Sequence, residues 1–185
     1  MKATEQLKEE HKAIKLMLSI LNNVSKKLES GEKVDQEDLG HLLQFIKIFA
    51  DTCHHGKEED LLFVAMENVG IPRDRGPIGV MLKEHEMGRS YVRNVSEAVE
   101  KYKAGGPIYS SQFVDNAEKY IKLLTQHIGK EDNILYPMAD MQLSKEKQHE
   151  LIEKFEELER ERIGIGRHAE LHELLHHLKD KYLES

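Results

Sequence analysis

The sequence predicts an all-α protein, an up-down-up-down antiparallel four-helix bundle with an additional C-terminal helical segment. Three observations lead to this fold class. Charged residues make up 33% of the 185 residues, whereas aromatic residues make up 6% and tryptophan is absent, which is typical of amphipathic helices. Turn residues interrupt the chain at only a few places. Between those places, apolar residues recur at alternating steps of three and four, the period of a helix with one buried face.

The turn signals divide the first 143 residues into four long helical segments. Gly, Pro, Asp and Ser interrupt helices, and they gather at 30–35, 69–77, 104–107 and 139–143. The helices predicted between them cover 3–29, 36–68, 77–103 and 108–138. Loops of four to nine residues can only return the chain alongside itself, so successive helices should alternate in direction.

Each predicted helix carries one apolar stripe that should face the centre of the bundle. The stripes are Leu7, Ile14, Leu18, Leu21 and Leu28; Leu39, Leu43, Ile46, Ala50, Leu61 and Ala65; Ile78, Leu82, Val92, Val95, Val99 and Tyr102; and Phe113, Ala117, Tyr120, Leu124, Ile134 and Met138. Asp35 is a suitable N-cap for the second helix, and Pro77 suits the first turn of the third. Both residues support the predicted helix starts.

The bundle domain is predicted to cover residues 1–140, with a helical extension over 141–185. A helical run reaches about Ile163, the GIG sequence at 164–166 breaks it, and a last amphipathic helix follows. Its apolar positions could pack on the bundle or on a second subunit, which would make a homo-oligomer. These positions are Leu171, Leu174, Leu175, Leu178 and Tyr182.

The last helix also contains His168, His172, His176 and His177. Their spacing could bind a transition metal on the helix surface or supply an extra ligand over the mouth of the bundle. We favour a polar face opposite the leucines, because no repeated pattern of His and carboxylate accompanies these histidines.

Charge and composition exclude several classes of partner. The net charge is −7 and no basic block occurs, so we expect no nucleic-acid partner. Cys53 is the only cysteine, which excludes an intrachain disulfide and favours a reducing compartment. The chain starts with charged residues and contains no run of about 18 apolar residues. We therefore expect a soluble, cytoplasmic protein with no membrane partner.

Polar residues interrupt each apolar stripe on its buried face. These residues are His11, His54, Glu58, His85, His127 and Glu131. A buried carboxylate without a partner costs several kcal/mol, so the two glutamates need nearby positive charge. Lys57 and Lys130 lie about 100° around the helix from that face. A metal cation is the simplest partner, because His at i and Glu at i+4 can converge on one ion.

The candidate ligands belong to an internal repeat. "HHGKEEDLLF" at 54–63 aligns without gaps on "HIGKEDNILY" at 127–136, and "LKEEH" before His11 resembles "LKEH" before His85. The chain thus reads as two copies of a helical hairpin, each supplying one His and one His-x-x-x-Glu pair. Such an arrangement predicts two equivalent half-sites that hold two metals bridged by two carboxylates.

The repeat also indicates which residues are candidate ligands and which are only adjacent to them in the sequence. Only His54 has a counterpart at 127, and the α-helical phase places His55 and Glu59 on a flanking face. We expect His55, Lys57, Glu59 and Asp60 to support the site from outside or to be solvated. Cys53 should be a small buried residue and not a ligand.

Two further residues leave alternatives open. Arg89, one turn after His85, could point toward a bound anion or form a salt bridge with Glu86 or a neighbouring helix. Tyr120 could hydrogen-bond a metal-bound ligand or act as a redox group, but such tyrosines are more often core residues with a satisfied hydroxyl.

The pattern His11, His54-x-x-x-Glu58, His85, His127-x-x-x-Glu131 resembles the hemerythrin-like (HHE cation-binding) domain family over about residues 1–140. The resemblance implies a non-haem di-iron centre inside the bundle, with the four histidines as terminal ligands and the two glutamates as bridges. Oxygen-carrying members have a second His where this chain has Arg89. Their fourth helix ends with Asp five residues after its His, whereas the repeat here favours Glu131, with Asp132 adjacent. These differences favour the His, His-x-x-x-Glu, His, His-x-x-x-Glu subclass over reversible oxygen carriage.

The resemblance also implies a class of function. The protein should bind or sense O2, NO or H2O2, or take part in iron or nitrosative-stress handling. One alternative is a di-iron enzyme, such as a peroxidase or an iron–sulfur cluster repair factor. Another is a metal-free helical scaffold in which the inward His and Glu satisfy one another. Zn or Mn could replace iron, because mixed His and carboxylate sites do not discriminate sharply between metals.

Overall fold

The computed structural model describes residues 1–105 and 111–183. The described residues are helical apart from their connections and contain no strand, so the predicted all-α class is confirmed. The elements are α1 Ala3–Glu29, α2 Gln36–Gln44, η1 Phe45–His55, η2 Glu58–Leu62, α3 Phe63–Asn68, α4 Pro77–Lys103, α5 Ser111–Lys130, η3 Glu131–Leu135, α6 Tyr136–Gln142, α7 Lys145–Arg162 and α8 Arg167–Leu183, where η denotes a π-helix.

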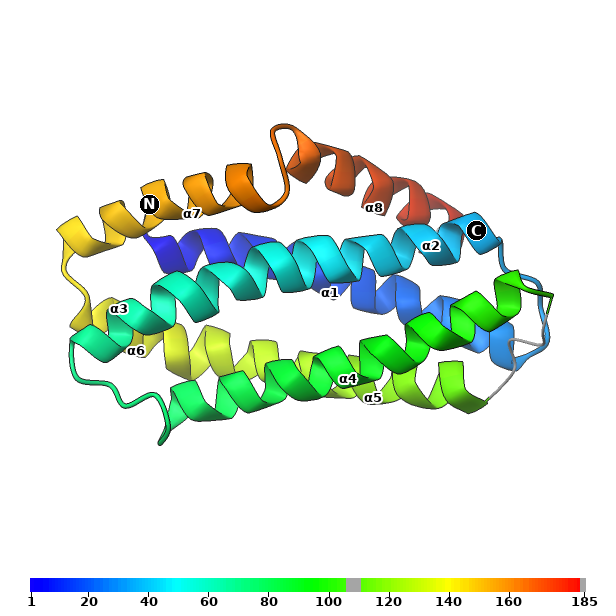
Figure 1. Cartoon of the computed structure of the whole chain (residues 1–185), viewed down its shortest axis with the longest axis horizontal. Helices are drawn as coiled ribbons and strands as arrows, with labels where there is room; N and C mark the ends of the chain where they lie inside the picture. The colour runs from blue at the N-terminus through cyan, green and yellow to red at the C-terminus, as the bar shows by residue number, and fades with distance from the viewer. Residues whose placement is uncertain (106–110, 184–185) are drawn as a thin grey trace.

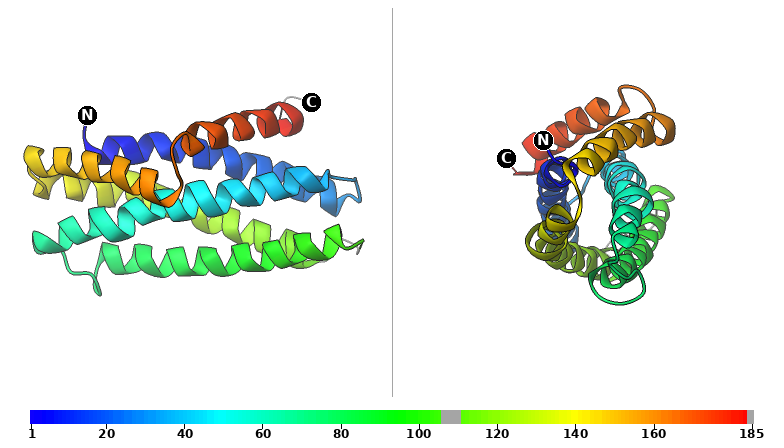
Figure 2. Two further views of the ribbon diagram at one scale, coloured as in Figure 1. Left: turned by 45° about the horizontal axis from the view of Figure 1, so that its top comes forward. Right: turned by 90° about the vertical axis from the view of Figure 1, so that its left-hand side faces the viewer.

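Long helical rods lie side by side along the length of the molecule (Figure 1). One rod is α1, and the next is the continuous run from α2 through η1 and η2 to α3. The remaining two are α4 and the run from α5 through η3 to α6. The end-on view in Figure 2 shows these rods around a common centre, with α7 and α8 together on one side.

Several helix boundaries fall where the sequence places them. The Asp35 side chain accepts a hydrogen bond from the Glu37 amide at 2.8 Å and caps α2. Pro77 occupies the first turn of α4, which follows Gly76 at φ 82°. The predicted turn at 104–107 and the start of the helix predicted over 108–138 lie partly outside the described residues.

The predicted turn at 139–143 is wrong. The helix continues through α6 to Gln142, and the chain becomes extended only at Leu143. Ala139 favours a helix and is fully buried. The Asp140 side chain accepts a hydrogen bond from the Thr4 hydroxyl at 2.7 Å, which fixes this turn against α1. Ser144 then caps α7 by accepting from the Lys147 amide at 3.2 Å.

Two π-helices occupy equivalent positions of the repeat. η2 begins at Glu58 and η3 at Glu131, and each spans five residues. In a π-helix each amide bonds to the carbonyl five residues back, so a turn holds more residues than the 3.6 of an α-helix. Side chains within and after a π-helix therefore point in a direction that differs from the one an α-helix would give them.

This rotation corrects two predicted core positions. Ile134 is 54% exposed and Leu61 is only partly buried, whereas the next residues, Leu135 and Leu62, are 1% and 0% exposed. The other positions of the four predicted stripes are buried or partly buried. The α-helical period therefore fails within η2 and η3, whereas the predicted positions Ile46 and Ala50 of η1 are buried.

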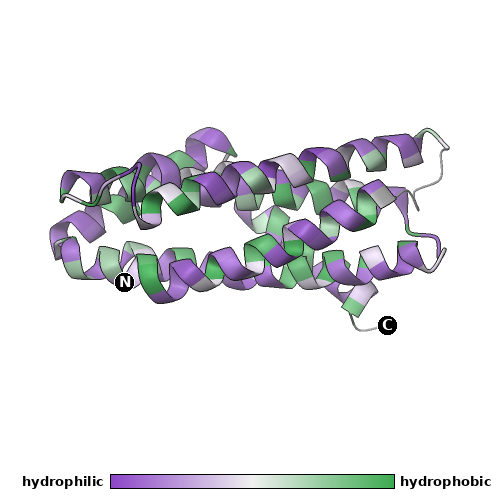
Figure 3. Ribbon diagram, turned by 90° about the horizontal axis from the view of Figure 1, so that it is seen from below, coloured by the Kyte–Doolittle hydropathy of each residue, from purple (hydrophilic) through white to green (hydrophobic). Residues whose placement is uncertain are grey.

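The buried apolar side chains form two clusters. One contains the C-terminal part of α1, α2 and η1, the neighbouring parts of α4 and α5, and α8. The other contains the start of α1, α3, the start of α4, α6 and α7. The interrupting His and Glu residues lie between the two clusters in every rod. Figure 3 shows hydrophilic and hydrophobic residues interleaved along the helices, as amphipathic helices require.

The C-terminal extension packs on the rods of its own chain. Leu171, Leu175, Leu178 and Tyr182 of α8 are buried, and the Tyr182 hydroxyl donates to Asp38 at 2.6 Å. Leu174 is partly buried. These side chains therefore contribute to the core between α1, α2 and α8. Among the described helices, none is long and apolar enough to cross a membrane.

The π-helical phase can be tested with two adjacent substitutions. Leu135→Ala should lower the free energy of unfolding by about 2–5 kcal/mol, because it leaves a cavity in the core. Ile134→Ala should change the free energy of unfolding by less than about 0.5 kcal/mol, because this side chain faces solvent. Urea denaturation of both variants at the same metal content measures the difference. A larger loss of unfolding free energy for Ile134→Ala than for Leu135→Ala would indicate an α-helical phase here and contradict the structure.

Candidate metal centre

The structure brings together the six residues that interrupt the stripes. They come from all four rods: His11 from α1, His54 from η1, Glu58 from η2, His85 from α4, His127 from α5 and Glu131 from η3. None is more than 2% exposed. Because apolar clusters lie on both sides of this layer, the six side chains interact with one another and not with bulk water.

The histidines form two pairs through their Nε2 atoms. The Nε2 atoms of His11 and His54 lie 3.1 Å apart, and those of His85 and His127 lie 3.0 Å apart. Each pair combines one His from the first helix of a hairpin with one from the second. The two pairs are therefore the half-sites that the repeat predicts.

Both glutamates reach both pairs. The Glu131 oxygens lie 3.2 Å from His11 Nε2 and 2.9 Å from His127 Nε2. Glu58 Oε2 lies 3.4 Å from His85 Nε2 and 3.8 Å from His54 Nε2. A carboxylate that approaches both half-sites can bridge two ions, one in each half-site.

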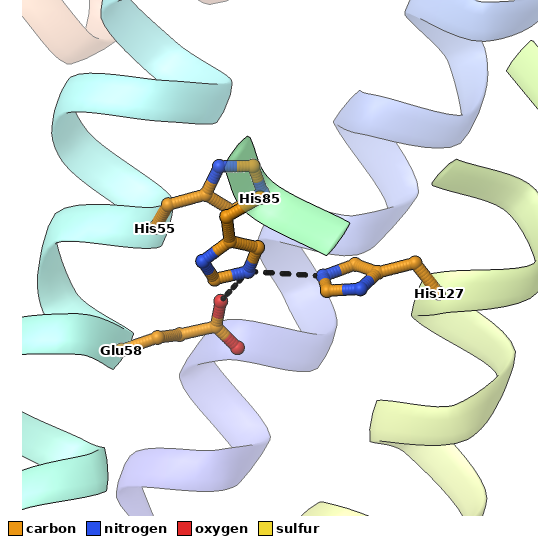
Figure 4. Close-up of side chains that lie close together, drawn as sticks. All are labelled: His55, Glu58, His85 and His127. Carbon is orange, nitrogen blue, oxygen red and sulfur yellow. Dashed lines mark hydrogen bonds and ion pairs between the residues drawn. The ribbon is translucent and has the colours of Figure 1, made fainter. Parts of the chain in front are cut away.

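The six residues and His55 form two groups of potential metal ligands, and within each group the ligand atoms all lie within 4.8 Å of one another. The first contains His11, His54, Glu58 and Glu131, and the second contains His55, Glu58, His85 and His127. Figure 4 shows the second group, with Glu58 and His127 both directed at the ring of His85. Mixed imidazole and carboxylate groups of this kind suit Zn, Mn or Fe.

A carboxylate holds the outer nitrogen of each imidazole. The Nδ1 contacts are His11 with Asp132 at 2.8 Å, His54 with Glu10 at 2.8 Å, His85 with Glu59 at 2.6 Å and His127 with Glu84 at 2.9 Å. Such a partner places a proton on Nδ1 and leaves the Nε2 lone pair free to bind a metal. Two Nε2 lone pairs about 3 Å apart repel unless a proton or a metal ion lies between them.

Cations hold these carboxylates in turn. Their pairs are Lys57 with Glu10 at 2.6 Å, Lys130 with Glu84, Arg89 with Glu59 at 2.7 Å and Lys15 with Asp132 at 3.0 Å. Each pair has its counterpart in the other copy of the repeat, so the duplication includes the charges around the centre. Lys57 is fully buried and also pairs with Glu159 of α7 at 3.0 Å. Of the two positions expected for Lys57, it takes the one that supports the site from outside, and it is not solvated.

The inner carboxylates are incompletely satisfied by the protein. Three buried oxygens have no hydrogen-bond partner: Glu58 Oε2, Glu131 Oε1 and Glu131 Oε2. The imidazoles approach Glu131 closely, but the geometry of these contacts is not that of a hydrogen bond. Buried oxygens of this kind need positive charge, which fits a metal ion.

The pKa shifts show the same demand for positive charge. Burial alone would raise the pKa of Glu131, but the charge of His127 and the contacts with the other imidazoles hold it well below its usual range. Burial would lower the pKa of His11, but Asp132 and Glu131 raise it to about 9. Despite burial, nearby carboxylates likewise raise the pKa of His85 and His127, so without a metal these imidazoles favour the protonated form that supplies positive charge.

Two residues break the symmetry of the centre. His55 aligns with Ile128 and Tyr136 aligns with Phe63 in the repeat. The His55 ring stacks on His85 with 3.9 Å between ring centroids, and its Nδ1 contacts Asp51 at 3.2 Å. The Tyr136 hydroxyl donates to Glu58 at 2.6 Å and lies 3.3 Å from His11 Nε2. Each half-site thus gains one polar group that the other lacks.

His55 corrects the expected flanking position, because this residue is only 5% exposed and faces the centre. Its helix is π-helical over Phe45–His55, so the α-helical phase does not apply. Tyr136 and the outer partners Glu10, Glu84 and Asp132 were not predicted as part of the site. The repeat contained a signal for all four. Glu10, Glu84 and Asp132 are each adjacent in sequence to one of the six residues, and Tyr136 stands at an aligned position where the two copies differ.

The remaining candidates from the sequence fall outside the centre. Arg89 pairs with Asp51, Glu59 and Glu86, so it forms the salt bridges expected as the alternative to anion binding. Cys53 is buried, and burial raises its pKa to about 12, which suppresses the thiolate. Tyr120 is buried and lines a cavity, and within the described residues no hydrogen bond joins it to the six residues.

The histidines of α8 contribute one residue near the centre. His168 lies with Glu10 and Glu159 in a group whose ligand atoms are within 4.8 Å of one another. The Lys57 ammonium already pairs with both carboxylates of that group. The rings of His168 and His172 pack against Phe49 at 4.9 and 5.2 Å. His176 and His177 are exposed, which agrees with a polar face on α8.

Comparison with known proteins identifies a family. The family model "Hemerythrin HHE cation binding domain" matches residues 2–139. Uncharacterized proteins of Mycobacterium bovis and Mycobacterium tuberculosis are 25% identical over 162 residues, which cover 88% of this chain. The aligned region spans 63% of the length of these relatives. No solved structure matches the chain significantly.

The two copies of the outer charge pair differ in burial, which gives a matched experiment. Glu10→Gln should lower the free energy of unfolding by up to about 3 kcal/mol, because it removes the carboxylate closest to the buried Lys57 ammonium. Glu84→Gln should cost about 1 kcal/mol or less, because the Lys130 side chain is 37% exposed. Urea denaturation of the metal-free variants measures both values. Equal costs would show that burial of Lys57 does not matter to stability.

Proposed function

The chain belongs to the hemerythrin HHE cation-binding domain family, and from this premise we propose that it holds two non-haem iron ions. In this proposal residues 1–140 are an up-down-up-down four-helix bundle around the metal pair. Residues 141–185 are a helical extension that packs along one side of it. The alternating direction of the four rods in Figure 1 supports this topology.

One observation carries the proposal. Four imidazole Nε2 atoms and two carboxylates without full hydrogen bonding converge in a buried layer, and every imidazole is held by a carboxylate on Nδ1. The proposed ligands of one iron are His11 and His54, and those of the other are His85 and His127. Glu58 and Glu131, whose oxygens approach both histidine pairs, would help to hold both ions. His55 is an additional candidate ligand on the His85 side.

The ligand of the iron pair is proposed to be a small molecule such as O2, NO or H2O2. Six protein ligands on two ions leave coordination positions for water or a small molecule. Bound iron supplies a Lewis acid and one-electron redox chemistry at those positions. The apolar clusters on both sides exclude bulk water, and the outer lysines and Arg89 balance the surrounding carboxylates. These features support a role in sensing such ligands or in iron and nitrosative-stress handling.

A di-iron enzyme, such as a peroxidase, is the second candidate, and Tyr136 favours it. The Tyr136 hydroxyl donates a hydrogen bond to Glu58 Oε1 at 2.6 Å beside the His11 half-site. Burial and the charge of Glu58 raise the pKa of Tyr136 well above its usual range, so the proton stays on the phenol oxygen. A buried hydroxyl that keeps its proton at this place can donate a hydrogen bond to a group bound nearby.

Metal analysis tests the proposal directly. Anaerobic loading should give close to two irons per chain, and Glu131→Gln should lower that number, because it removes the proposed bridging charge. Glu150→Gln, which alters a partly exposed carboxylate paired with Lys147, is the matched control and should keep full loading. Elemental analysis after desalting gives the stoichiometry, with parallel loading by Zn and Mn. Wild-type protein without bound metal would reject the proposal and favour a metal-free scaffold.

Spectroscopy of the same loaded protein separates metal binding from ligand binding. Azide, peroxide or NO should change the absorption spectrum of the iron-loaded chain. An unchanged spectrum at full iron content would reject the small-ligand function and leave a metal-binding protein. Turnover of peroxide with an added reductant would identify the enzyme, and its absence together with tight ligand binding would favour a sensor.

A further inference from the structure

A cavity of about 220 Å³ lies between η1, α4 and α5, next to the candidate metal centre. Its walls include the apolar side chains of Ile46, Val92 and Leu124 and the ring of Tyr120. His55 lines the same cavity, and its ring stacks on His85. One imidazole ring therefore lies between this cavity and the His85 half-site.

The cavity is larger than a diatomic molecule or peroxide requires. A water molecule occupies about 30 Å³ of the liquid, and an apolar cavity of about 150 Å³ is enough to bind benzene. The volume here therefore suits an organic molecule with a ring or a short chain. Apolar walls with a few polar groups are typical of sites for small organic ligands.

Tyr120 supplies a polar group without a protein partner. The residue is 3% exposed, and its hydroxyl has no hydrogen-bond partner among residues 1–105 and 111–183. Burial and the negative charge of Asp51 raise its pKa, so the hydroxyl keeps its proton and is a donor. The hydroxyl is therefore free to donate a hydrogen bond to an acceptor atom of a ligand in the cavity.

The charges along the cavity favour an anion. The acidic residues Asp51 and Glu84 are already paired, with Arg89 at 2.8 Å and with His127 at 2.9 Å. Lys47 donates to the Ser96 hydroxyl at 2.7 Å, and neither Lys47 nor Arg93 forms an ion pair within the described part of the chain. Two cations without carboxylate partners therefore line a cavity whose acids are neutralised.

We propose that this cavity binds a small organic carboxylate with an apolar body. The body packs against Ile46, Val92 and Leu124, and the carboxylate accepts a hydrogen bond from Tyr120 in the field of Lys47 and Arg93. The location of the ligand beside a metal centre rests on the proposed function, whereas its binding depends on the cavity alone. The bound acid would be a substrate or an effector of the centre, distinct from a diatomic ligand.

Benzoate is a suitable probe, because its ring fits the cavity volume and its carboxylate is an acceptor. Calorimetric titration should show one benzoate per chain, both for the iron-loaded full-length protein and after removal of the iron by chelation. Tyr120→Phe keeps the ring and removes the donor, and it should weaken benzoate binding about 10-fold or more. Tyr91→Phe is the matched control, because Tyr91 does not line the cavity, and it should leave the affinity unchanged.

A second variant tests the cavity itself. A Cβ at Gly88 would meet the Tyr120 ring at 3.5 Å, an ordinary contact, so the side chain of Gly88→Leu would extend into the cavity space. This variant should abolish benzoate binding, and neutral benzyl alcohol should bind the wild type more weakly than benzoate does. Benzoate binding that is insensitive to both Tyr120→Phe and Gly88→Leu would overturn the proposal. Binding only to iron-loaded protein would also overturn it, since benzoate would then be a metal ligand.

The outcomes also separate this proposal from the metal function. Benzoate binding that depends on Tyr120 in a chain that takes up no metal would sustain the cavity site and reject the di-iron proposal. Full iron loading without any benzoate binding would reject the cavity site and leave the metal proposal intact.

Discussion

The structure depends on the balance of charge in a layer that water does not reach. Glu58 and Glu131 are fully buried at the centre of the rods, and oxygens on both lack hydrogen-bond partners. The negative charge that they introduce requires the converging imidazoles, and each imidazole requires an outer carboxylate on Nδ1. Each of those carboxylates pairs with a cation farther from the centre, so negative and positive groups alternate from the glutamates outward. The cations are Lys57, Lys130, Arg89 and Lys15. The position of nearly every ionisable side chain in this part of the protein follows from the two inner glutamates.

The duplication of the hairpin explains why this network is regular, and its two exceptions indicate how the halves differ. Both copies supply the inner His and Glu residues, the outer carboxylates and the cations behind them, and in both a π-helix begins at the inner glutamate. His55 and Tyr136 have apolar counterparts in the opposite copy. An additional imidazole on one side and a phenol on the other make the surroundings of the two histidine pairs chemically unequal.

Much of this arrangement was predictable from the sequence, and the errors share a physical cause. The bounds of α1 and α4 follow from turn residues, and His11 or Glu131 is conspicuous because a polar residue interrupts an apolar stripe. Ile134, Leu61 and His55 were misplaced because the α-helical period was extended through π-helices, which no local composition distinguishes. The partners of the histidines could not be predicted in detail, because the contact of Glu10 with Lys57 and Glu159 depends on how α7 packs. The turn predicted at 139–143 failed because tertiary contacts of Asp140 outweigh local turn propensity.

The division of the apolar core into two clusters affects how the protein loses its structure. A polar layer joins the clusters, and most of its cohesion is electrostatic, so each cluster can open with partial independence from the other. The two helices of the extension pack on different clusters, α7 on one and α8 on the other, and the chain between them crosses the layer. The extension therefore links the two clusters covalently on one side of the molecule. We expect this link to couple the unfolding of the two ends of the bundle.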